Sequence, residues 1–391
     1  WGSGPRGGLE GGMAYARHYH LPTVIAMDIG GTTTDVSIIQ QEAVSLRPYG
    51  AIEALTTSFP LPKLQSFGLG GSSIVKVLAG QIHIGPESVG AVPGPACFGR
   101  GGTSPTLTDA LLLARVLDPE RYLGGELKLS HDRAAHALQA EVGAALGCNA
   151  EAAAQAVITA FQTQVGARLK KILTAAGVDP NHAALLAFGG GGPIIASGVA
   201  RAMGIKRVII PRLASVFSAF GIGFSHLAHE YQVPLTDAGS ASIVAIKQEL
   251  AVRARRDMAG EGVDPDRCEY RYSLWSAGAD SVVEEALDED QSISRADPRA
   301  TLKAIFELPV SSLAGGTPKI SGTPVSRGGV EVLVEGRAMT LAIYNDQDLK
   351  PGHSVDGACL VKGDYLTCLV DPGWRLSVTG NQDLMLEESR S

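Results

Sequence analysis

The chain has 391 residues, which is enough to bury large hydrophobic cores in two or more domains. Its formal net charge is −7, and it has no basic run with interleaved aromatic residues, which argues against nucleic acid as the main partner. No apolar stretch approaches the roughly 20 residues that a transmembrane helix requires, so we expect no membrane partner.

The five cysteines form no C-x-x-C pair, and their number is odd. This favours free thiols in a reducing compartment over a disulfide framework or a zinc site. No secretory signal is recognisable, so we expect a cytoplasmic location.

The first predicted elements are a short helix and a hairpin. Residues 8–20 can form the helix after Pro5. An apolar run from Thr23 to Met27 and a β-branched run from Val36 to Gln40 then predict two strands. The turn between them reads Asp28-Ile-Gly-Gly-Thr-Thr-Thr-Asp35, with an aspartate at each edge.

This turn predicts a phosphate site, because small residues let backbone N–H and hydroxyl groups surround a phosphate. The candidate phosphate-binding residues are Gly30, Gly31, Thr32 and Thr33. Asp28 and Asp35 can hold a metal ion, and Asp35 can instead orient water for attack on a γ-phosphoryl group. The turn is followed by a strand and not by a helix, and it contains no lysine, so it is neither a Rossmann turn nor a P-loop. The alternative is an ordinary hairpin, with aspartates capping the turn and at least one threonine pointing inward.

Three segments follow before the long helices. The turn at Gly68–Ser73 is either a phosphate or substrate contact or a plain turn. Residues 80–106 are rich in Gly and Pro with little periodicity, which predicts an ordered, functional loop. Thr106 or Thr108 can then cap a helix carrying Leu111, Ala114 and Leu117, with Asp109 in its first turn.

Helices are predicted over residues 131–145 and 151–176, with Gly177 ending the second. A strand at Ala183–Phe188, a helix at Pro193–Met203 and a strand at Lys206–Ile210 then predict a βαβ unit. Its loop consists of Gly189, Gly190, Gly191 and Gly192. These glycines let a nucleotide approach the backbone at a helix N-terminus; the alternative is a close helix–strand crossing without a ligand.

The last third of the chain changes character. Residues 240–300 are more charged and predict a solvated amphipathic helix. From about Val325 to Ser391 the pattern becomes that of short strands separated by Pro-Gly turns. We therefore predict a small β-rich module at the C-terminus.

The hairpin resembles the second phosphate motif of the actin, sugar-kinase and heat-shock-chaperone ATPase superfamily. It is most similar to the hydantoinase A/5-oxoprolinase family, which includes ATP-dependent acetone and acetophenone carboxylase subunits. Further segments resemble that family in the same order, over roughly residues 1–235. They are Ser3–Gly8, Gly85–Ala110 and Ala187–Pro193.

The resemblance implies an α/β chain with a partial actin-like ATPase (ribonuclease H-like) fold and a C-terminal β-rich module. It implies a hydantoinase A-type ATPase domain over residues 1–238 and an α+β module over residues 239–391, β-rich from about residue 325. It also implies ATP-dependent phosphorylation of a cyclic amide or ketone carbonyl, for ring-opening hydrolysis or carboxylation. ATP and Mg²⁺ would be the cofactors, and a B-type subunit the partner in a hetero-oligomer.

Within the family signature, Asp109 is a candidate base or metal ligand, and Arg100 a candidate clamp for a carboxylate or phosphate. Cys97 is either a nucleophile or a small buried thiol; no His lies near it in sequence, which favours the thiol. The pair His226-x-x-His229 has no further obvious ligand, so we interpret it as incidental.

Two features depart from the family. Its members carry an earlier Asp-x-Gly-Gly-Thr motif, whereas this chain starts at Trp1 after that point. We therefore expect a fragment, or a chain that needs this half from another polypeptide and is inactive alone. The segment Tyr270–Tyr272 also lacks the Gly-Gln that commonly follows in the family. The alternative function is a non-catalytic nucleotide-binding or scaffolding subunit of a larger complex.

Overall fold

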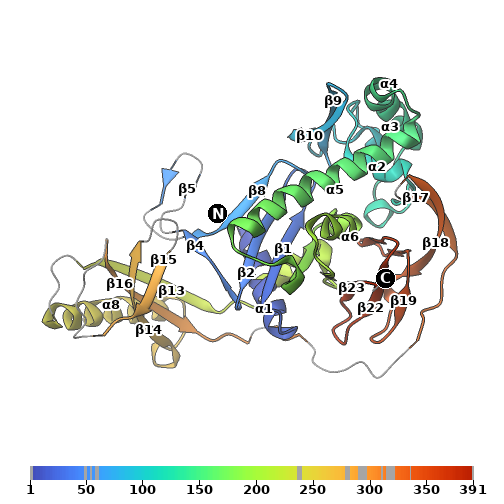
Figure 1. The fold of residues 1–391 in the computed structure, drawn as a ribbon. Coiled ribbons are helices and arrows are strands. Elements are labelled where there is room, and N and C mark those ends of the chain that lie inside the picture. The colour runs from blue at the N-terminus through green and yellow to red at the C-terminus, as the bar shows by residue number, and fades with distance from the viewer. Residues whose placement is uncertain are drawn as a thin grey trace. The chain divides into compact units, whose positions relative to one another are not determined.

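The computed structural model describes residues 3–47, 51–52, 55–57, 61–235, 240–277, 282–288, 297–309, 311–313, 322–334 and 336–389. The chain is mixed α/β (Figure 1). It forms two compact units, which are described separately. The larger unit comprises residues 1–42, 64–222 and 313–391, and the smaller comprises residues 43–63 and 223–312. The predicted domain boundary between residues 238 and 239 stays a prediction.

A mixed sheet forms the centre of the larger unit. Its parallel core consists of β1 (Thr23–Ile29), β11 (Ala183–Phe188) and β12 (Arg207–Ile210). Beyond β1, the sheet continues with the antiparallel strands β2 (Thr34–Gln40) and β8 (Leu64–Phe67). Beyond β12, it continues with the antiparallel strands β23 (Leu384–Glu388), β22 (Trp374–Val378) and β19 (Ser354–Asp356). Every residue of β11 is buried, as expected for a parallel strand covered by helices.

The predicted βαβ unit is confirmed. Helix α6 (Gly192–Met203) connects β11 to its parallel neighbour β12, and Pro193 lies in its first turn. Gly204 ends the helix in a left-handed conformation, with φ of +81°.

Helix α1 (Ser3–His18) starts earlier than predicted and packs closely against α7 (Phe217–Ile222). A Cβ atom on Gly7 would overlap the carbonyl oxygen of Ser218, and one on Gly221 would overlap the carbonyl oxygen of Gly7. A Cβ on Gly11 would lie 2.7 Å from the Phe217 ring. The glycines therefore let the two helix backbones touch, which fixes the position of Ser218.

The prediction of a loop over residues 80–106 is wrong in part. Strand β10 (Gln81–Ser88) pairs antiparallel with β9 (Ser73–Leu78), and the short 3-10 helix η1 (Ala96–Phe98) follows. Gly85 and Pro86 conceal this strand in the sequence, and a register shift between Ile84 and Ser88 accommodates them.

The predicted helices of this region are present with different ends. Thr106 is the N-cap of α2 (Leu107–Leu113), which is shorter than predicted because Arg115 is left-handed, with φ of +62°. The helix predicted over residues 131–145 consists of α3 (His131–Leu138), a π-helical turn at Gln139–Gly143 and α4 (Ala144–Leu146). Asn149 caps α5 (Ala150–Ala175), and Gly177 follows its end with φ of +66°, which confirms the predicted stop.

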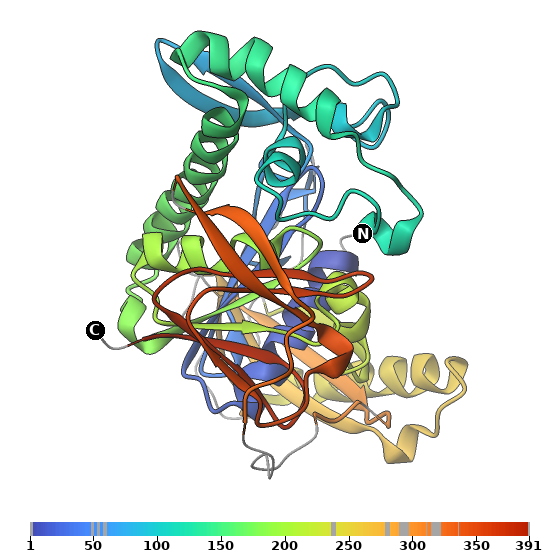
Figure 2. The same ribbon diagram turned by 90° about the vertical axis from the view of Figure 1, so that its right-hand side faces the viewer.

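The predicted C-terminal strands are present. A second sheet has the order β17 (Gly329–Val334), β18 (Arg337–Asn345), β20 (Cys359–Lys362) and β21 (Thr367–Val370). The N–H of Leu333 donates to the carbonyl of Ala114 at 3.3 Å, which joins this sheet to the end of α2. Figure 2 shows these strands in orange and red, together with β22 and β23 of the central sheet.

The C-terminal segment is also joined to α1 through Asp383, which is fully buried. Its carboxylate accepts hydrogen bonds from the hydroxyls of Tyr15 at 2.8 Å and Tyr19 at 2.5 Å. Burial and the charge of Asp383 raise the pKa of both phenols, so they remain protonated donors.

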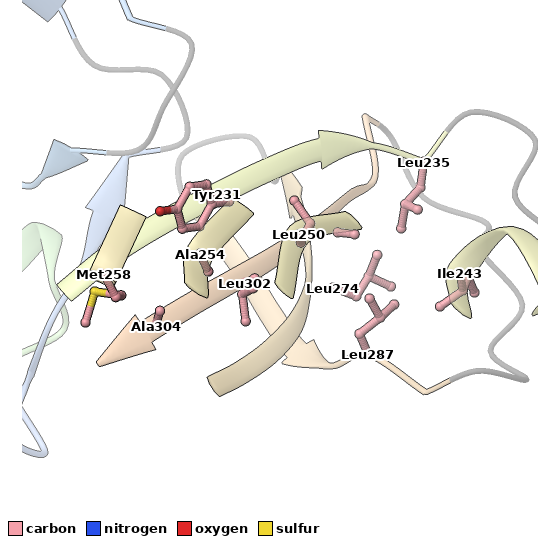
Figure 3. Close-up of a cluster of buried hydrophobic side chains, with 11 residues drawn as sticks. Tyr231, Leu235, Ile243, Leu250, Ala254, Met258, Leu274, Leu287, Leu302 and Ala304 are labelled. Carbon is pink, nitrogen blue, oxygen red and sulfur yellow. The ribbon is translucent and has the colours of Figure 1, made fainter. Parts of the chain in front are cut away.

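The smaller unit packs one helix on an antiparallel sheet of order β13 (Leu227–Pro234), β16 (Arg299–Phe306), β14 (Glu269–Ala277) and β15 (Val282–Ala286). The predicted amphipathic helix is present as α8 (Ser240–Gly260), but the prediction is wrong for the rest of residues 240–300, which includes β14 and β15. Its residues Ile243, Leu250, Ala254 and Met258 are buried with Leu274, Leu302 and other sheet residues (Figure 3). Their spacing of seven, four and four residues places them on one helix face. Four short strands form two separate pairs, β4 (Leu46–Arg47) with β7 (Leu61–Pro62) and β5 (Ala51–Ile52) with β6 (Leu55–Thr56). The short β3 (Ala43–Val44) follows β2 in the strand order of the central sheet.

None of the helices in the described ranges is long and apolar enough to cross a bilayer.

The contact between α1 and α7 gives a testable prediction. Changing Gly7 to Ala should destabilise the protein by about 1–3 kcal/mol, because the new methyl group overlaps the backbone of Ser218. Gly4 lies in the same helix, and a Cβ atom added there would have no atom within 4 Å, so Gly4→Ala should instead stabilise the protein slightly. Urea denaturation midpoints of both variants test this. Equal midpoints for the two variants would contradict the packing argument.

Candidate functional site

The predicted hairpin is confirmed. In the antiparallel pair of β1 and β2, Asp28 lies directly opposite Asp35, and the N–H of Gly30 donates to the carbonyl of Thr33 at 3.0 Å. Side chains of directly opposite residues share one face of a sheet. The two carboxylates at the edges of the turn are therefore neighbours.

Helices α1 and α7 cover these carboxylates. Asp28 and Asp35 line a small pocket together with Pro5 and Gly8 of α1 and Ser218 of α7. The Ser218 hydroxyl donates to Oδ2 of Asp28 at 3.1 Å. Burial raises the pKa of Asp28, the hydrogen bond from Ser218 opposes this shift, and the charge of Asp35 adds to it. Ser218 cannot be recognised from the sequence, because it lies 190 residues from Asp28 and no motif marks it.

The turn of the hairpin packs against the turn at Gly68–Ser73. The N–H of Gly71 donates to Gly30 at 3.0 Å, and the N–H of Ser72 donates to Gly31 at 2.6 Å. A Cβ on Gly70 would lie 2.7 Å from the carbonyl of Gly31, so only glycine fits there. This close approach supports a structural reason for the glycines of the second turn.

One threonine of the turn points inward, as predicted. The hydroxyl of Thr34, which is fully buried, donates to the carbonyl of Leu69 at 2.6 Å. Thr32 is exposed and Thr33 is half-buried. Thr32 and Thr33 therefore remain the candidates for contact with a phosphate.

The loop at Gly189–Gly192 meets the same hairpin. The N–H of Gly191 donates to the carbonyl of Ile29 at 2.9 Å. Gly189 has φ of +79°, and a Cβ there would overlap Oδ1 of Asp28, so close packing explains this glycine. Gly192 is the first residue of α6. At Gly190, in contrast, a Cβ would meet no atom within 4 Å.

These turns line one cavity with a volume of about 420 Å³. Gly30, Gly31, Gly190 and Gly191 contribute to one wall, together with Gly71, Ser72 and Thr108. Other parts of the wall come from residues 121–123, 343–345 and 362–367. The structure thus brings together two glycine pairs that are about 160 residues apart in a cavity of the size typical for small-molecule sites. Asp28 and Asp35 line the separate pocket beside α1.

Asp109 has a structural position. It is fully buried, and its carboxylate accepts hydrogen bonds from the N–H of Cys97 at 2.7 Å and from the N–H and hydroxyl of Thr106 at 2.9 and 2.7 Å. With Thr106 it forms a capping box for α2. The structure does not bring Asp109 to the hairpin carboxylates, so its predicted catalytic role has no geometric support and stays a prediction.

The other signature residues do not assemble a reactive centre. Cys97 is buried, and its pKa is raised by burial and by Asp109, which opposes formation of a thiolate. Arg100 is exposed. Within the described residues, no three His, Cys, Asp or Glu side chains form a group that could hold a metal ion. His229 instead contacts Glu261 at 3.2 Å.

The raised pKa of Asp28 predicts how stability depends on pH. A carboxyl that binds its proton more tightly in the folded than in the unfolded state weakens folding as pH rises from about 3.8 through the raised value. Asp28→Asn should therefore raise the melting temperature of the ligand-free protein at neutral pH, and this gain should shrink as pH falls towards 4. Thermal melts of both proteins from pH 4.5 to 8 test this. A variant that melts lower than the native protein throughout would refute it.

The buried position of Cys97 predicts its reactivity. Iodoacetamide at neutral pH should leave Cys97 unmodified in the folded protein and alkylate it after denaturation. The half-buried Cys148 and Cys268 serve as internal references in the same digest. Mass spectrometry of the peptides gives the readout. Rapid alkylation of Cys97 in the folded protein would contradict this prediction and favour the interpretation of Cys97 as a nucleophile.

Comparisons with known proteins agree with these motifs. The family model described as "Hydantoinase/oxoprolinase" matches residues 2–231. The chain is 25% identical to caprolactamase subunit alpha of Pseudomonas jessenii, over 96% of this chain and 60% of that protein. It is also 25% identical to the acetone carboxylase beta subunit of Xanthobacter autotrophicus, over 99% of this chain and 60% of that protein. The chain thus spans about three-fifths of the length of these relatives.

A solved structure supports the same fold. Nucleotide-free acetone carboxylase, for which ATP-dependent acetone carboxylation is described, superposes with a TM-score of 0.81 at 22% identity. The match covers 98% of this chain and 61% of that one. Because the family model covers more than half of the chain, this protein belongs to the hydantoinase/oxoprolinase family.

Proposed function

We propose that this chain is the A-type part of an enzyme that uses ATP to phosphorylate the carbonyl oxygen of a cyclic amide or ketone. Ring-opening hydrolysis or carboxylation would follow. The observation that carries the proposal is the convergence of the Gly30–Gly31 turn and the Gly190–Gly191 loop on one cavity, beside the paired Asp28 and Asp35. The ATP-dependence of acetone carboxylation by the structural relative supports it.

The two hairpin carboxylates fit Mg²⁺. This ion is usually held by one or two carboxylates together with water and the phosphates of the substrate. Asp28 and Asp35 are such a pair, and their mutual repulsion, which contributes to the raised pKa of Asp28, would be relieved by a cation. Bound there, Mg²⁺ would neutralise part of the phosphate charge.

The protein's own contribution would be to position the reactants. The backbone N–H of Gly31 and the hydroxyls of Thr32 and Thr33 would hold phosphate oxygens, next to Gly30, whose own N–H donates to the carbonyl of Thr33. Gly189–Gly192 would let the adenosine part approach the backbone. Ser218 would orient Asp28, while Asp35 would contribute to metal binding or catalysis. Attack of the carbonyl oxygen on the γ-phosphorus of ATP would break the bond between that phosphorus and the bridging oxygen, which leaves with ADP. The phosphorylated oxygen would activate the former carbonyl carbon for the next step.

We also propose an actin-like ATPase fold, in which the β1–β2 hairpin is the second phosphate motif and the loop before α6 is the adenosine motif. The parallel strands β1, β11 and β12 with the antiparallel β2 support this assignment. Residues 1–238 would form the ATPase domain and residues 239–391 the C-terminal module.

The relatives suggest the type of assembly. Both the caprolactamase and the acetone carboxylase relatives are named as subunits. This supports a hetero-oligomer, in which we propose a B-type subunit as the partner. Nothing in the comparisons favours the alternative of a non-catalytic scaffold.

Substrate-stimulated ATP hydrolysis tests this function. The full chain, alone and with its B-type partner, should release ADP when given one member of a panel of hydantoins, 5-oxoproline, other lactams and ketones. Asp35→Asn should lower this rate by about 100-fold or more, because it removes one of the two carboxylates that we propose to hold Mg²⁺. Asp132→Asn changes an exposed aspartate outside both pockets and serves as the matched control. Turnover that persists in Asp35→Asn, or no stimulation across the panel, would refute the proposal.

A further inference from the structure

A lysine on the cavity wall lies outside the predicted motifs. Lys362 is the last residue of β20, in register with Asn345 of β18 and with Thr367 of β21. All three residues line the cavity that the glycine turns also line. The second sheet therefore brings a cation to this cavity from a part of the chain that the phosphate motifs do not include.

The charge of Lys362 is not matched by an ion pair with any residue that the structure describes. Its neighbour Arg121 pairs with Asp364 at 3.1 Å, and Arg327 pairs with Asp348 at 2.6 Å. Lys362 has no carboxylate within 4 Å among the described residues. Burial lowers its pKa, Asp118 opposes this and Arg121 adds to it. A cation that has lost water without gaining a partner is unfavourable, and a bound anion would relieve this.

The backbone around Lys362 is fixed. The N–H of Gly363 donates to the carbonyl of Leu366 at 2.7 Å, closing the turn between β20 and β21. The N–H of Gly124 donates to the carbonyl of Asp364 at 2.9 Å, which joins this turn to the short 3-10 helix η2 (Tyr122–Gly125). A site on such a braced turn needs little reorganisation when a ligand binds.

The residues next to Lys362 suit a ligand that also has an apolar body. Tyr122, Leu123, Ile343 and Leu366 line the same cavity. An apolar pocket with few polar groups is the usual environment of a small-molecule site. A compact molecule carrying one oxyanion would satisfy both the lysine and these walls.

We propose that Lys362 binds an oxyanion, either a carboxylate or a phosphate group, of a small molecule held in this cavity. The inference rests on the proposed function, which supplies two molecules that carry an oxyanion. They are an acidic cyclic amide, through its carboxylate, and the nucleotide, through a phosphate. In the first case the enzyme would prefer amides with a carboxylate over uncharged ones.

Calorimetric titration of the full 391-residue chain distinguishes these sources. The probes are 5-oxoproline against its uncharged amide, and ADP against adenosine. Wild-type protein should bind at least one charged probe more tightly than its neutral counterpart. Lys362→Met should weaken that probe about tenfold or more without changing the neutral one. Lys362→Arg, which keeps the charge, should retain most of the affinity.

Lys350→Met is the matched control, because Lys350 is exposed and lies outside the cavity. Loss of affinity for 5-oxoproline identifies a substrate carboxylate, and loss for ADP identifies a nucleotide phosphate; either supports the inference. The inference is overturned if wild type and Lys362→Met bind both charged probes with equal affinity. It is also overturned if wild type binds neither charged probe more tightly than its neutral counterpart. Lys362→Gln provides a second neutral variant if the Met variant does not fold.

The two proposals can fail separately. Lys362-dependent binding without any substrate-stimulated ATP hydrolysis would leave the anion site in place and remove the proposed function. ATP hydrolysis that Asp35→Asn abolishes, together with unaltered probe binding in Lys362→Met, would do the reverse.

Discussion

The contact of glycine-bearing turns around the end of β1 is the constraint on which the candidate site depends. Gly70 approaches Gly31 so closely that a methyl group would not fit, and Gly189 has the same relation to the Asp28 carboxylate. Hydrogen bonds from Gly71 and Gly191 to Gly30 and Ile29 join the turns. Because no side chain separates them, turns from distant parts of the sequence line one cavity.

Electrostatically unfavourable groups are concentrated around this constraint. Asp28 and Asp35 face each other with partial burial, and Lys362 lies on the cavity wall without an ion pair among the described residues. The buried carboxylates of Asp383 and Asp109, in contrast, are satisfied by hydrogen bonds, the first from two tyrosines and the second within its capping box. Unsatisfied groups that persist beside a cavity are typical of binding sites, where a ligand completes them.

Features carried by local pattern could be predicted from the sequence. The hairpin, the βαβ unit around α6 and the strands after residue 325 follow from short-range periodicity and turn residues. Strand β10 was not recognised, because Gly85 and Pro86 interrupt its pattern while pairing with β9 maintains the strand. In the sequence, an aspartate that caps a helix cannot be distinguished from one that contacts a substrate, which is why Asp109 is a candidate base. Its burial and its hydrogen bonds in the structure are those of a capping residue.

The sequence by itself determined the family and the hairpin with its two aspartates, since the order Asp-x-Gly-Gly-Thr-x-x-Asp depends on a few neighbouring residues. Only the tertiary structure decided which residues meet that hairpin. Ser218 reaches Asp28 because glycines let α1 and α7 touch, and Lys362 reaches the cavity because β20 pairs with β18 and β21. Such contacts arise from packing between segments far apart in the chain, and a single sequence contains no local signal for them.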